Sequence, residues 1–435
     1  MELWIISLVL LAALAALLVA GVWIALTLLG VGWVAMVLFT QSPAGSLMAT
    51  TVWGSSTSWA LTALPLFIWM GEILFRTRIS EDMFRGLAPW MAPLPGRLMH
   101  CNVVGCGIFA AISGSSAATA ATIGRITIPE LRKRGYDEPM AVGSLAGAGT
   151  LGLLIPPSII MIVYGVAADV SIARLFVAGV LPGIMLMLMF SGYILAWALL
   201  NPGKTPPRES ITSFGQKVYA ARYLIPAVLL IGVVIGSIYT GVATPTEAAA
   251  IGVAGSLALA AVSGSLNRRT FGASVMGATR TSCMIAFILT GAAFLTVAMG
   301  FTGVPRTMAE WIGRQGFSAW QLIAVLTVLY IILGCFIDGI SMVVLTSSVI
   351  LPSVKAAGID LLWFGIFVVL VVEMAQITPP VGFNLFVLQG LTGRNMFYVA
   401  RASLPFFVLM VLAVAIIWQF PVIVTYLPGK MFRLG

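Results

Sequence analysis

Long apolar segments follow one another along almost the whole chain, separated by short polar connections. About 20 consecutive apolar residues are enough to cross a bilayer as a helix. The longest polar connection, residues 201–222, is too short to form a soluble domain. The pattern predicts an all-α polytopic membrane protein, one membrane domain over residues 1–435, with spanning helices near residues 3–20, 21–39, 58–75, 138–165, 172–199, 223–241, 246–264, 277–300, 361–389 and 402–425.

The composition supports this fold class. The 435 residues are 60% hydrophobic and 9% charged, and the mean hydropathy is +1.08, whereas soluble domains have about 25% charged residues. Such a chain cannot cover a water-facing surface, so lipid must be its main solvent. The formal net charge of +9 is typical of basic residues gathered in cytoplasmic loops. No aromatic and basic platform accompanies these residues, so they do not indicate nucleic-acid binding.

The cysteines and the N-terminal segment have structural explanations. The four cysteines lie in apolar or glycine-rich surroundings, and the chain has one histidine. We therefore expect the cysteines to pack in the interior rather than to hold a metal ion. The apolar N-terminus carries Glu2, lacks a basic leader and runs directly into the second apolar segment. It is expected to be a first spanning helix, not a cleaved signal.

Two further apolar stretches, about 98–125 and 321–350, are rich in Gly, Ser and Thr and differ from the spanning segments. Arginines precede the first stretch, and Arg132, Lys133 and Arg134 follow it. Because basic residues collect on the cytoplasmic side, both flanks should lie there. A segment with both ends on one side enters the membrane and returns as a re-entrant helical hairpin. Such backbone is tolerated only inside protein or along a water-filled cavity.

Residues 223 positions apart match one another repeatedly and without gaps, although the chain has only 22 prolines. The series indicates a duplication, with a first repeat over about 58–199 and a second over about 277–425. The matched pairs are Pro129 with Pro352, Gly135 with Gly358, Asp137 with Asp360, Pro156 and Pro157 with Pro379 and Pro380, and Pro182 with Pro405.

The two copies should have opposite orientations in the membrane. The spanning segments expected between the hairpins are odd in number, so the second copy enters from the opposite side. Secondary transporters combine inverted repeats with broken helices near the membrane midplane. We therefore predict an inverted repeat with two re-entrant helical hairpins and two broken helices.

Each copy contains two helix breaks. The first has the hairpin turn 113–119 and the interruption 149–158, and the second has 338–341 and 378–384. Two consecutive prolines remove two backbone donors. The freed carbonyl groups, with nearby Ser, Thr and Asn oxygens, suit a sodium ion, since hard cations prefer oxygen ligands. The half-helices that restart after the breaks direct amide groups at the same cavity, where an anion is favoured.

Kinking and packing alone would explain one such break, but four breaks in two related pairs favour a binding site. We expect one sodium ion in each copy, with the solute held by the half-helices. The candidate sodium ligands are Ser113, Ser115, Ser116, Gly149, Pro156, Gly334, Asp338, Thr378 and Gly382, and the candidate solute contacts are Ser116, Thr119, Pro157, Ser158 and Asn384.

Ionisable residues within the apolar segments are functional candidates, because burying them is costly. We rank Asp338 first, since it falls at the second hairpin turn, where the related residue of the first copy is Ser115. Glu72 and Glu373 are expected to pair with nearby arginines or to sit at helix ends. His100 is expected to be a bystander near a boundary. The remaining candidates are Asp169 and Glu247.

Residues 147–152 match the string G-x-G-x-x-G. A dinucleotide fingerprint requires a preceding strand and a following amphipathic helix, whereas this string lies inside a membrane segment. Gly143 and Gly147 have the small-xxx-small spacing of close helix packing, which explains the string better. The chain also lacks the nucleotide-binding loop G-x-x-x-x-G-K-[ST]. We expect no organic cofactor.

Four ordered motifs carry a family resemblance: GSSAAT at 114–119, GTLGLLIPPS at 149–158, TPTEAAA at 244–250 and ITPPVGFN at 377–384. Together they resemble the large membrane subunit of TRAP (tripartite ATP-independent periplasmic) transporters, over essentially the whole chain. The resemblance implies an elevator-type carrier of the ion-transporter superfamily in the bacterial inner membrane. It also implies that inward sodium flow drives uptake of organic acids such as C4-dicarboxylates or sialic acid.

The resemblance further implies two protein partners, a small four-helix membrane subunit and a soluble periplasmic substrate-binding protein. Because the chain begins with the large subunit's helices, we expect the small subunit to be a separate polypeptide. The expected docking surface includes the amphipathic stretch 301–320 with Arg306 and Arg314. The binding protein is expected to set the solute selectivity.

Other functions compete with this one. A stand-alone sodium/carboxylate symporter of the same superfamily is the nearest alternative. A channel or a structural membrane subunit would need neither an inverted repeat nor broken helices. A membrane-embedded enzyme would need a catalytic pair at membrane depth, and none is evident in the sequence. We therefore expect a transporter and no enzymatic activity.

Overall fold

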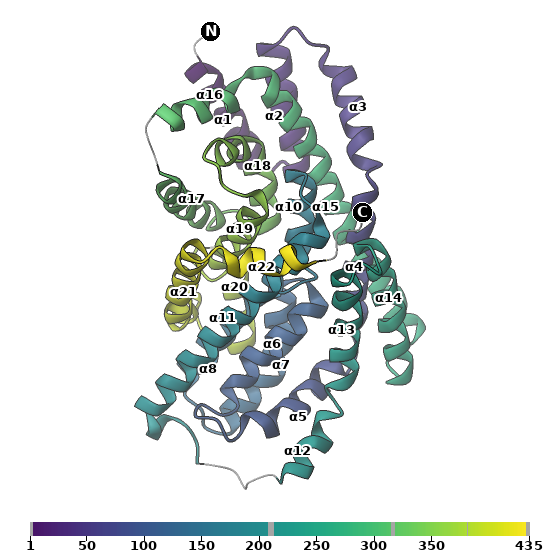
Figure 1. Ribbon diagram of the computed structural model, residues 1–435, viewed down its shortest axis with the longest axis vertical. Coiled ribbons are helices and arrows are strands. Elements are labelled where there is room, and N and C mark those ends of the chain that lie inside the picture. Colours follow the sequence, from purple (N-terminus) through teal and green to yellow (C-terminus); the bar gives the residue numbers. More distant parts are fainter. Residues whose placement is uncertain (1–2, 208–212, 315–317, 381, 432–435) are drawn as a thin grey trace.

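The structure, a computed structural model, describes residues 3–207, 213–314, 318–380 and 382–431. All regular structure in these ranges is helical, which confirms the expected all-α class (Figure 1). The helices are α1 (Leu3–Val19), α2 (Ile24–Phe39), α3 (Ala44–Ser56), η1 (Trp59–Thr62), α4 (Ala63–Phe75), α5 (Ile79–Met91), α6 (Met99–Ser113), α7 (Ser116–Lys133), α8 (Glu138–Gly149), α9 (Leu151–Leu154), α10 (Ile159–Ala168), α11 (Ile172–Leu200), η2 (Pro202–Lys204), α12 (Phe214–Ala221), α13 (Ile225–Tyr239), α14 (Pro245–Val262), α15 (Arg268–Thr302), α16 (Val304–Arg314), α17 (Ala319–Gly334), α18 (Gly339–Ala356), α19 (Leu361–Gln376), α20 (Phe383–Thr392), α21 (Met396–Gln419) and α22 (Val422–Lys430).

One group of helices, which we call the frame, comprises α1–α4 and α13–α15. The 35-residue helix α15 packs against α2, α3 and α4, and α14 packs against α4 and α13. Small residues permit these contacts: a Cβ added to Gly291 of α15 would lie 2.6 Å from the carbonyl oxygen of Ala25 on α2. Close backbone approach through glycine is typical of membrane helices.

A second group, which we call the core group, comprises α6–α11 and α17–α22. α6 packs against α7, α8 and α9, whereas α18 packs against α10 and α19. α8 packs along α21, and a Cβ added to Gly143 of α8 would lie 2.2 Å from the carbonyl oxygen of Ala402. Helices from the two halves of the sequence are therefore interleaved in this group (Figure 1).

The frame and the core group meet along α4, α13 and α15. α4 packs against α6 and α10, α13 against α6 and α11, and α15 against α18. A Cβ added to Gly71 of α4 would lie 3.1 Å from the carbonyl oxygen of Ser113, where α6 ends. The frame thus reaches the turn between α6 and α7.

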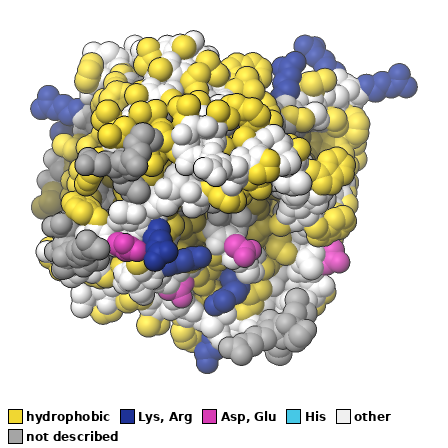
Figure 2. Space-filling view, turned by 90° about the horizontal axis from the view of Figure 1, so that it is seen from above, with side chains coloured by type: hydrophobic (Ala, Val, Ile, Leu, Met, Phe, Trp, Pro, Cys, Tyr) yellow, Lys and Arg dark blue, Asp and Glu magenta, His cyan; other side chains and the backbone are white. Residues whose placement is uncertain are grey.

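The outer surface is strongly apolar. Trp53, Leu188 and Leu200 are 72%, 68% and 82% exposed, which only a lipid environment would make favourable. On the end face shown in Figure 2, charged side chains form small separate groups among hydrophobic and uncharged ones. By length and composition, α11, α14, α15, α18 and α21 can each cross a bilayer, and three bent helix pairs bring the number of candidate spans to as many as eight.

Most expected segments correspond to observed helices, but several short helices were not predicted. These are α3, α5, α12 and α22. α5 carries Glu81 and Asp82 in its first turn, and α12 begins with a capping box between Ser213 and Gln216. Each of these helices is too short to be a membrane span; a capping box starts α12, whereas α3, α5 and α22 have no side-chain cap and are held by packing against other helices. The connection 201–222 therefore contains helix α12 as well as loop.

Residues related by the 223-residue offset occupy corresponding positions. Adding 223 to the bounds of α7 gives the bounds of α18, and the start of α8 similarly gives the start of α19. Asp137 and Asp360 cap α8 and α19 through their side chains. Gly135 and Gly358 both adopt a left-handed φ, of 74° and 71°. The remaining matched prolines fall within α7 and α18, within α11 and α21, and in the breaks that precede α10 and α20.

The segment predicted as the first hairpin turns back on itself. α6 and α7 pack together, and the Tyr136 hydroxyl, just beyond α7, accepts a hydrogen bond of 3.3 Å from the Leu98 amide, just before α6. The two outer ends of the segment therefore lie side by side. This arrangement generates a test of the predicted re-entrant topology.

We predict that single cysteines at Arg85 and Lys133 will react with an impermeant thiol reagent from the same, cytoplasmic side. α5, which carries Arg85, packs against α7, so the two positions share one end of the hairpin. The measurement is labelling of inside-out and right-side-out vesicles, in a chain whose Cys283 and Cys335 are replaced by serine. Labelling of the two positions from opposite sides would contradict the hairpin.

Candidate functional site

The turn between α6 and α7 depends on a glycine and a serine. Gly114 ends α6 with a φ of 58°, a conformation that glycine adopts at little cost. A Cβ added to it would lie 2.9 Å from the Pro157 carbonyl oxygen, so the turn touches the break that follows α9. Ser115 then caps α7, because its side chain accepts a hydrogen bond from the Ala118 amide.

Hydroxyl groups are buried at this turn. The exposed fractions of Ser113, Ser116 and Thr119 are 8%, 3% and 0%. Ser113 Oγ lies 2.7 Å from Thr119 Oγ1 and 3.3 Å from the Ser115 carbonyl oxygen. The turn therefore concentrates oxygen atoms, which hard cations prefer, in a place that water hardly reaches.

The broken helix of the first copy lies directly against the turn. α8 and α9 together meet α10 at a bend of 43°, and the buried residues Pro156 and Pro157 occupy the break. A Cβ added to Gly152 of α9 would lie 2.5 to 2.6 Å from backbone atoms of Ser115 and Ser116. Only glycine lets α9 come this close. After the break, the Ser158 side chain caps α10.

A carboxylate from the second copy completes this contact. Glu373, in the last turn of α19, is 0% exposed. Its Oε1 accepts a short hydrogen bond from Ser116 Oγ and a second, of 2.9 Å, from the Leu153 amide. Its Oε2 is buried and has no hydrogen-bond partner among the described residues. We call this meeting point of α7, α9 and α19 the Glu373 junction.

The second hairpin turn, between α17 and α18, packs against α19, the helix that carries Glu373. A Cβ added to Gly334 would lie 2.1 Å from Ala375 Cβ, and one added to Gly339 would lie 2.4 Å from Val372 Cγ1. The Gly339 position would also lie 3.0 Å from Ile160 Cδ1 of α10. The second hairpin turn thus contacts broken helices of both copies.

Asp338 has a clear structural role at this turn. Its Oδ1 accepts hydrogen bonds from the amides of Ile340 and Ser341, at 3.0 and 3.1 Å, and its Oδ2 accepts a short one from the Ser341 hydroxyl. It caps α18 as Ser115 caps α7. The half-buried carboxylate is therefore bound by its own helix end.

Hydrogen bonds connect the residues of the break after α19 to one another and to the last turn of α19. Thr378 Oγ1 donates a hydrogen bond of 2.7 Å to the Met374 carbonyl oxygen, and the Thr378 carbonyl oxygen accepts one of 3.1 Å from the Gly382 amide. A Cβ added to Gly382 would lie 2.7 Å from the Gln376 carbonyl oxygen. Carbonyl oxygens are thereby crowded around Gly382, the residue that precedes α20.

Asn384, in the first turn of α20, has an unsatisfied amide. It is 0% exposed, and neither its Oδ1 nor its Nδ2 has a hydrogen-bond partner among the described residues. Its Nδ2 lies 3.3 Å from the position of a Cβ added to Gly149, at the end of α8. A buried amide without partners is costly, so a ligand that satisfies it would be bound favourably.

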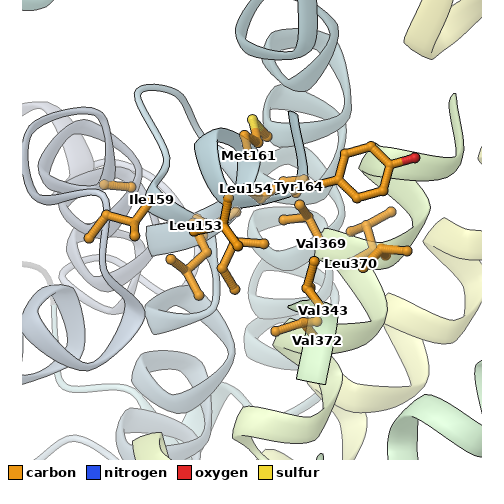
Figure 3. Close-up of a cluster of buried hydrophobic side chains, with 14 of the residues drawn as sticks. Leu153, Leu154, Ile159, Met161, Tyr164, Val343, Val369, Leu370 and Val372 are labelled. Atoms are coloured by element: carbon orange, nitrogen blue, oxygen red, sulfur yellow. The ribbon is translucent and has the colours of Figure 1, made fainter. Parts of the chain in front are cut away.

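Apolar side chains of both copies surround these polar groups. In the close-up of Figure 3, Leu154 lies toward Val369 and Val372 of α19, with Leu153 beside it and Ile159 on the side away from α19, and all five are buried. A polar contact in such a dry environment is stronger than one in water, and an unmade one is more costly. The junction is therefore an energetically demanding part of the core.

The structure brings the predicted first-copy ligands Ser113, Ser115 and Ser116 against the segment 149–156, and it places the second-copy candidates around the end of α19. Their assignment as ligands remains a prediction. Among the described residues, no cluster of three or more His, Cys, Asp or Glu side chains could hold a metal. A cation here would depend on hydroxyl, amide and carbonyl oxygens and a single carboxylate.

The other ionisable candidates have ordinary partners. Glu72 forms an ion pair of 2.6 Å with Arg76, as expected. His100 Nε2 lies 2.7 Å from the Pro95 carbonyl oxygen. Glu247 forms a capping box with Thr244 at the start of α14, and Asp169 follows α10 in a left-handed conformation.

Sequence reasoning underrated Glu373. It does lie near a helix end, but its observed partners are Ser116 and Leu153 rather than an arginine. The available signal was a single carboxylate after the uncharged run 361–372, five residues before Thr378. Its partners lie 257 and 220 positions away, which no local pattern reveals.

Many apolar helices, paired helix breaks and a buried polar centre between them define a multi-pass membrane transport protein. Residues 11–423 match the family described as "Tripartite ATP-independent periplasmic transporter, DctM component", and the chain belongs to this family. It is therefore a transport component of the bacterial inner membrane and not an enzyme.

Individual relatives match over most of the chain. The C4-dicarboxylate TRAP transporter large permease protein DctM of Pseudomonas aeruginosa is 32% identical over 404 residues, which cover 93% of this chain and 92% of that protein. The isethionate TRAP transporter permease protein DctMQ of Oleidesulfovibrio alaskensis is also 32% identical, over 95% of this chain and 65% of its own length. Among solved structures, the Alcanivorax borkumensis YdaH transporter, which has an unusual topology, matches with a TM-score of 0.65 and 13% identity over 94% of this chain and 97% of its own. This last likeness supports the fold.

We predict that Gly152→Ala will destabilise the protein, because the new methyl group would collide with backbone atoms of the 113–116 turn, which cannot rotate away. Overpacking of this kind costs about 1–3 kcal/mol. Gly232→Ala on α13 is the matched control, since nothing lies within 4 Å of its added Cβ. Thermal unfolding of both purified variants in detergent measures the difference. A melting temperature of Gly152→Ala equal to that of the control would contradict this close contact.

Proposed function

We propose that the chain is the sodium-coupled translocating subunit of a transporter that takes up small organic anions. The observation that supports this most is the buried polar centre shared by the two copies. It combines hydroxyl groups, one carboxylate and an unsatisfied amide, with Glu373 and Asn384 both fully buried. A protein keeps such groups in its core when a ligand satisfies them during function.

The first sodium ion would bind at the 113–116 turn. Ser113 and Ser116 offer hydroxyl oxygens, and Ser115 and the segment from Gly149 to Pro156 offer carbonyl oxygens. The Ser116 hydroxyl donates a hydrogen bond to Glu373. The lone pairs of Ser116 Oγ therefore stay available for a cation. The all-oxygen set suits a hard ion such as sodium.

A second sodium ion would bind between the second hairpin turn and the break after α19. Gly334 and Asp338 lie on one side, and Thr378 and Gly382 on the other. The Asp338 carboxylate, whose oxygens also accept hydrogen bonds from the start of α18, would offset part of the charge of the ion. The carbonyl oxygens crowded around Gly382 would supply most of the ligands.

The solute would bind between the restarted half-helices α10 and α20. The N-termini of helices favour anions, and the side chains offered there are Ser158 and Asn384, with Ser116 and Thr119 on the facing turn. Pro157 would line the solute site without donating a hydrogen bond. A carboxylate or a similar anionic group fits these donors. C4-dicarboxylates and sialic acid are the solutes that we consider first.

We propose an elevator mechanism, in which the core group moves against the frame. The observed division into two packed groups, joined along α4, α13 and α15, supports this assignment. Two inverted copies would carry the binding centre, and the α6–α7 and α17–α18 segments would act as re-entrant hairpins. The frame would then remain fixed in the bilayer.

The partners would be a small membrane subunit and a periplasmic binding protein. The amphipathic helix α16 is our candidate docking surface, and its exposed Arg306 pairs with Glu310 at 3.0 Å. The side chain of Arg314, also predicted at this surface, lies outside the described residues.

The main test is uptake by proteoliposomes that contain the chain and its small subunit, with an inward sodium gradient, the binding protein and a panel of organic acids. Sodium-dependent uptake that requires the binding protein supports the proposal. Full uptake by the chain alone would instead identify a stand-alone symporter. Uptake that ignores sodium would reject sodium coupling.

We predict that Ser116→Ala and Thr378→Val will each raise the sodium concentration that gives half-maximal uptake, by about 10-fold if a hydrogen-bonded oxygen in a dry site is worth 1–2 kcal/mol. Uptake is measured against sodium at saturating solute. The matched controls are Ser256→Ala and Thr327→Val, which remove buried or half-buried hydroxyl groups that bond only to their own helices. If both site variants retain the parental sodium dependence, the ligand assignment is wrong.

We predict that Asn384→Ala will raise the KM for the solute about 10-fold or more and leave expression normal, because the amide makes no structural hydrogen bond that the substitution could remove. Asn395→Ala is the control. That side chain caps α21, so its loss should lower stability and leave the KM unchanged. A parental KM in Asn384→Ala would exclude this residue from the solute site.

A further inference from the structure

Glu373 has an unusual combination of charge and isolation. It is 0% exposed, and the described residues offer neither an ion pair nor a hydrogen bond to its Oε2. An ionised carboxylate in such surroundings is costly unless a positive charge accompanies it. The two donors on Oε1, the Ser116 hydroxyl and the Leu153 amide, satisfy only half of the group.

Glu373 lies beside the proposed first sodium site. Ser116 is the first residue of α7, and Leu153 belongs to the single turn α9. Both elements flank the place where the first sodium ion is proposed. Gly152, next to Leu153, touches the backbone of Ser115 and Ser116, so the carboxylate lies across the tightest contact of this site.

The related residue of the first copy has no charge. Subtracting 223 from 373 gives Thr150, whose hydroxyl donates a hydrogen bond of 2.6 Å to the Gly147 carbonyl oxygen within its own helix. Likewise, Gly339 of the second copy occupies the position that corresponds to Ser116 of the first copy. The hydrogen bond between Ser116 and Glu373 joins one copy to the other, and at the related positions Gly339 offers no hydroxyl and Thr150 no carboxylate for a matching pair.

We propose that Glu373 belongs to the coupling-cation site at the 113–116 turn: Oε1 orients the Ser116 hydroxyl and holds α9, and the free Oε2 balances the charge of the bound sodium ion. This inference rests on the proposed function. The hydrogen bond from Ser116 turns the Ser116 lone pairs away from Glu373 and leaves them for the ion. Groups that orient a metal's ligands commonly change its affinity 10- to 100-fold when they are removed.

The first test measures sodium binding without transport. The purified full-length chain in detergent is melted at increasing sodium chloride, with choline chloride holding the ionic strength constant. Glu373→Gln keeps the size of the side chain and an acceptor for Ser116, but removes the charge. We expect the sodium concentration for half-maximal stabilisation to rise about 10-fold or more. An unchanged midpoint would overturn the inference.

The control separates charge from structure. Glu72→Gln removes another carboxylate of the membrane region, one that pairs with Arg76 in the frame. It is expected to lower the melting temperature without changing the sodium midpoint. An equal midpoint shift in Glu72→Gln and Glu373→Gln would mean that any lost carboxylate has this effect, and would also overturn the inference.

The second test asks whether Glu373 acts together with Ser116. Residues that share one interaction show non-additive effects, so the midpoint of Ser116→Ala with Glu373→Gln should rise less than the product of the two single changes. Independent, multiplicative changes would refute the orienting role. If the parent shows no sodium-dependent stabilisation or uptake, the proposed function itself fails. If the parent responds and Glu373→Gln responds equally, only the present inference fails.

Discussion

The cost of burying polar groups away from water is the constraint on which this core depends. Four broken segments place hydroxyl, amide and carboxylate groups among apolar side chains of both copies, where an unmade hydrogen bond is expensive. The Glu373 junction meets part of this cost by bonding to Ser116 and Leu153. The glycines of this region follow from the same constraint, because short hydrogen bonds between helix ends require backbones to approach closely. Gly114 and Gly152 stand at such approaches.

The two copies use the same backbone plan with different chemistry. Ser115 and Asp338 cap the second helix of their segments in the same way, one with a hydroxyl and the other with a carboxylate. Glu373 and Thr150 occupy related positions, and each contacts the other copy: Glu373 accepts hydrogen bonds from Ser116 and Leu153, and the Thr150 hydroxyl lies 3.6 Å from Met410 Sδ. The paired breaks follow the 223-residue offset, while different side chains at a few matched positions make the centre electrically asymmetric. A site that binds cations and an anion together benefits from such asymmetry.

The sequence predicted the architecture well because its signals are local. Apolar runs mark membrane helices, prolines and glycines mark breaks, and the constant 223-residue offset anticipates the matching bounds of α7 and α18. The short helices α3, α5 and α12 were missed because contacts with other helices, and in α12 a capping box, form them rather than a long apolar run. The partners of Glu373 were missed for another reason: they depend on how α19 packs against α7 and α9, and one sequence does not show which side chains meet when distant helices pack. Asp338 attracted attention by its place at a turn, but capping accounts for most of its hydrogen bonds.

The same polar groups give a physical reason for coupling within the proposed mechanism. If the core group slides against the frame, the Glu373 junction and Asn384 must pass through apolar surroundings. With a cation beside Glu373 and an anionic solute on Asn384, both groups are satisfied and the charges largely cancel, so the loaded centre can move. With only one of the two bound, a charge or an amide remains unmatched, and its desolvation opposes the movement. Tight coupling would then need no separate gate, because the penalty for moving a partly filled site is a property of the buried groups themselves.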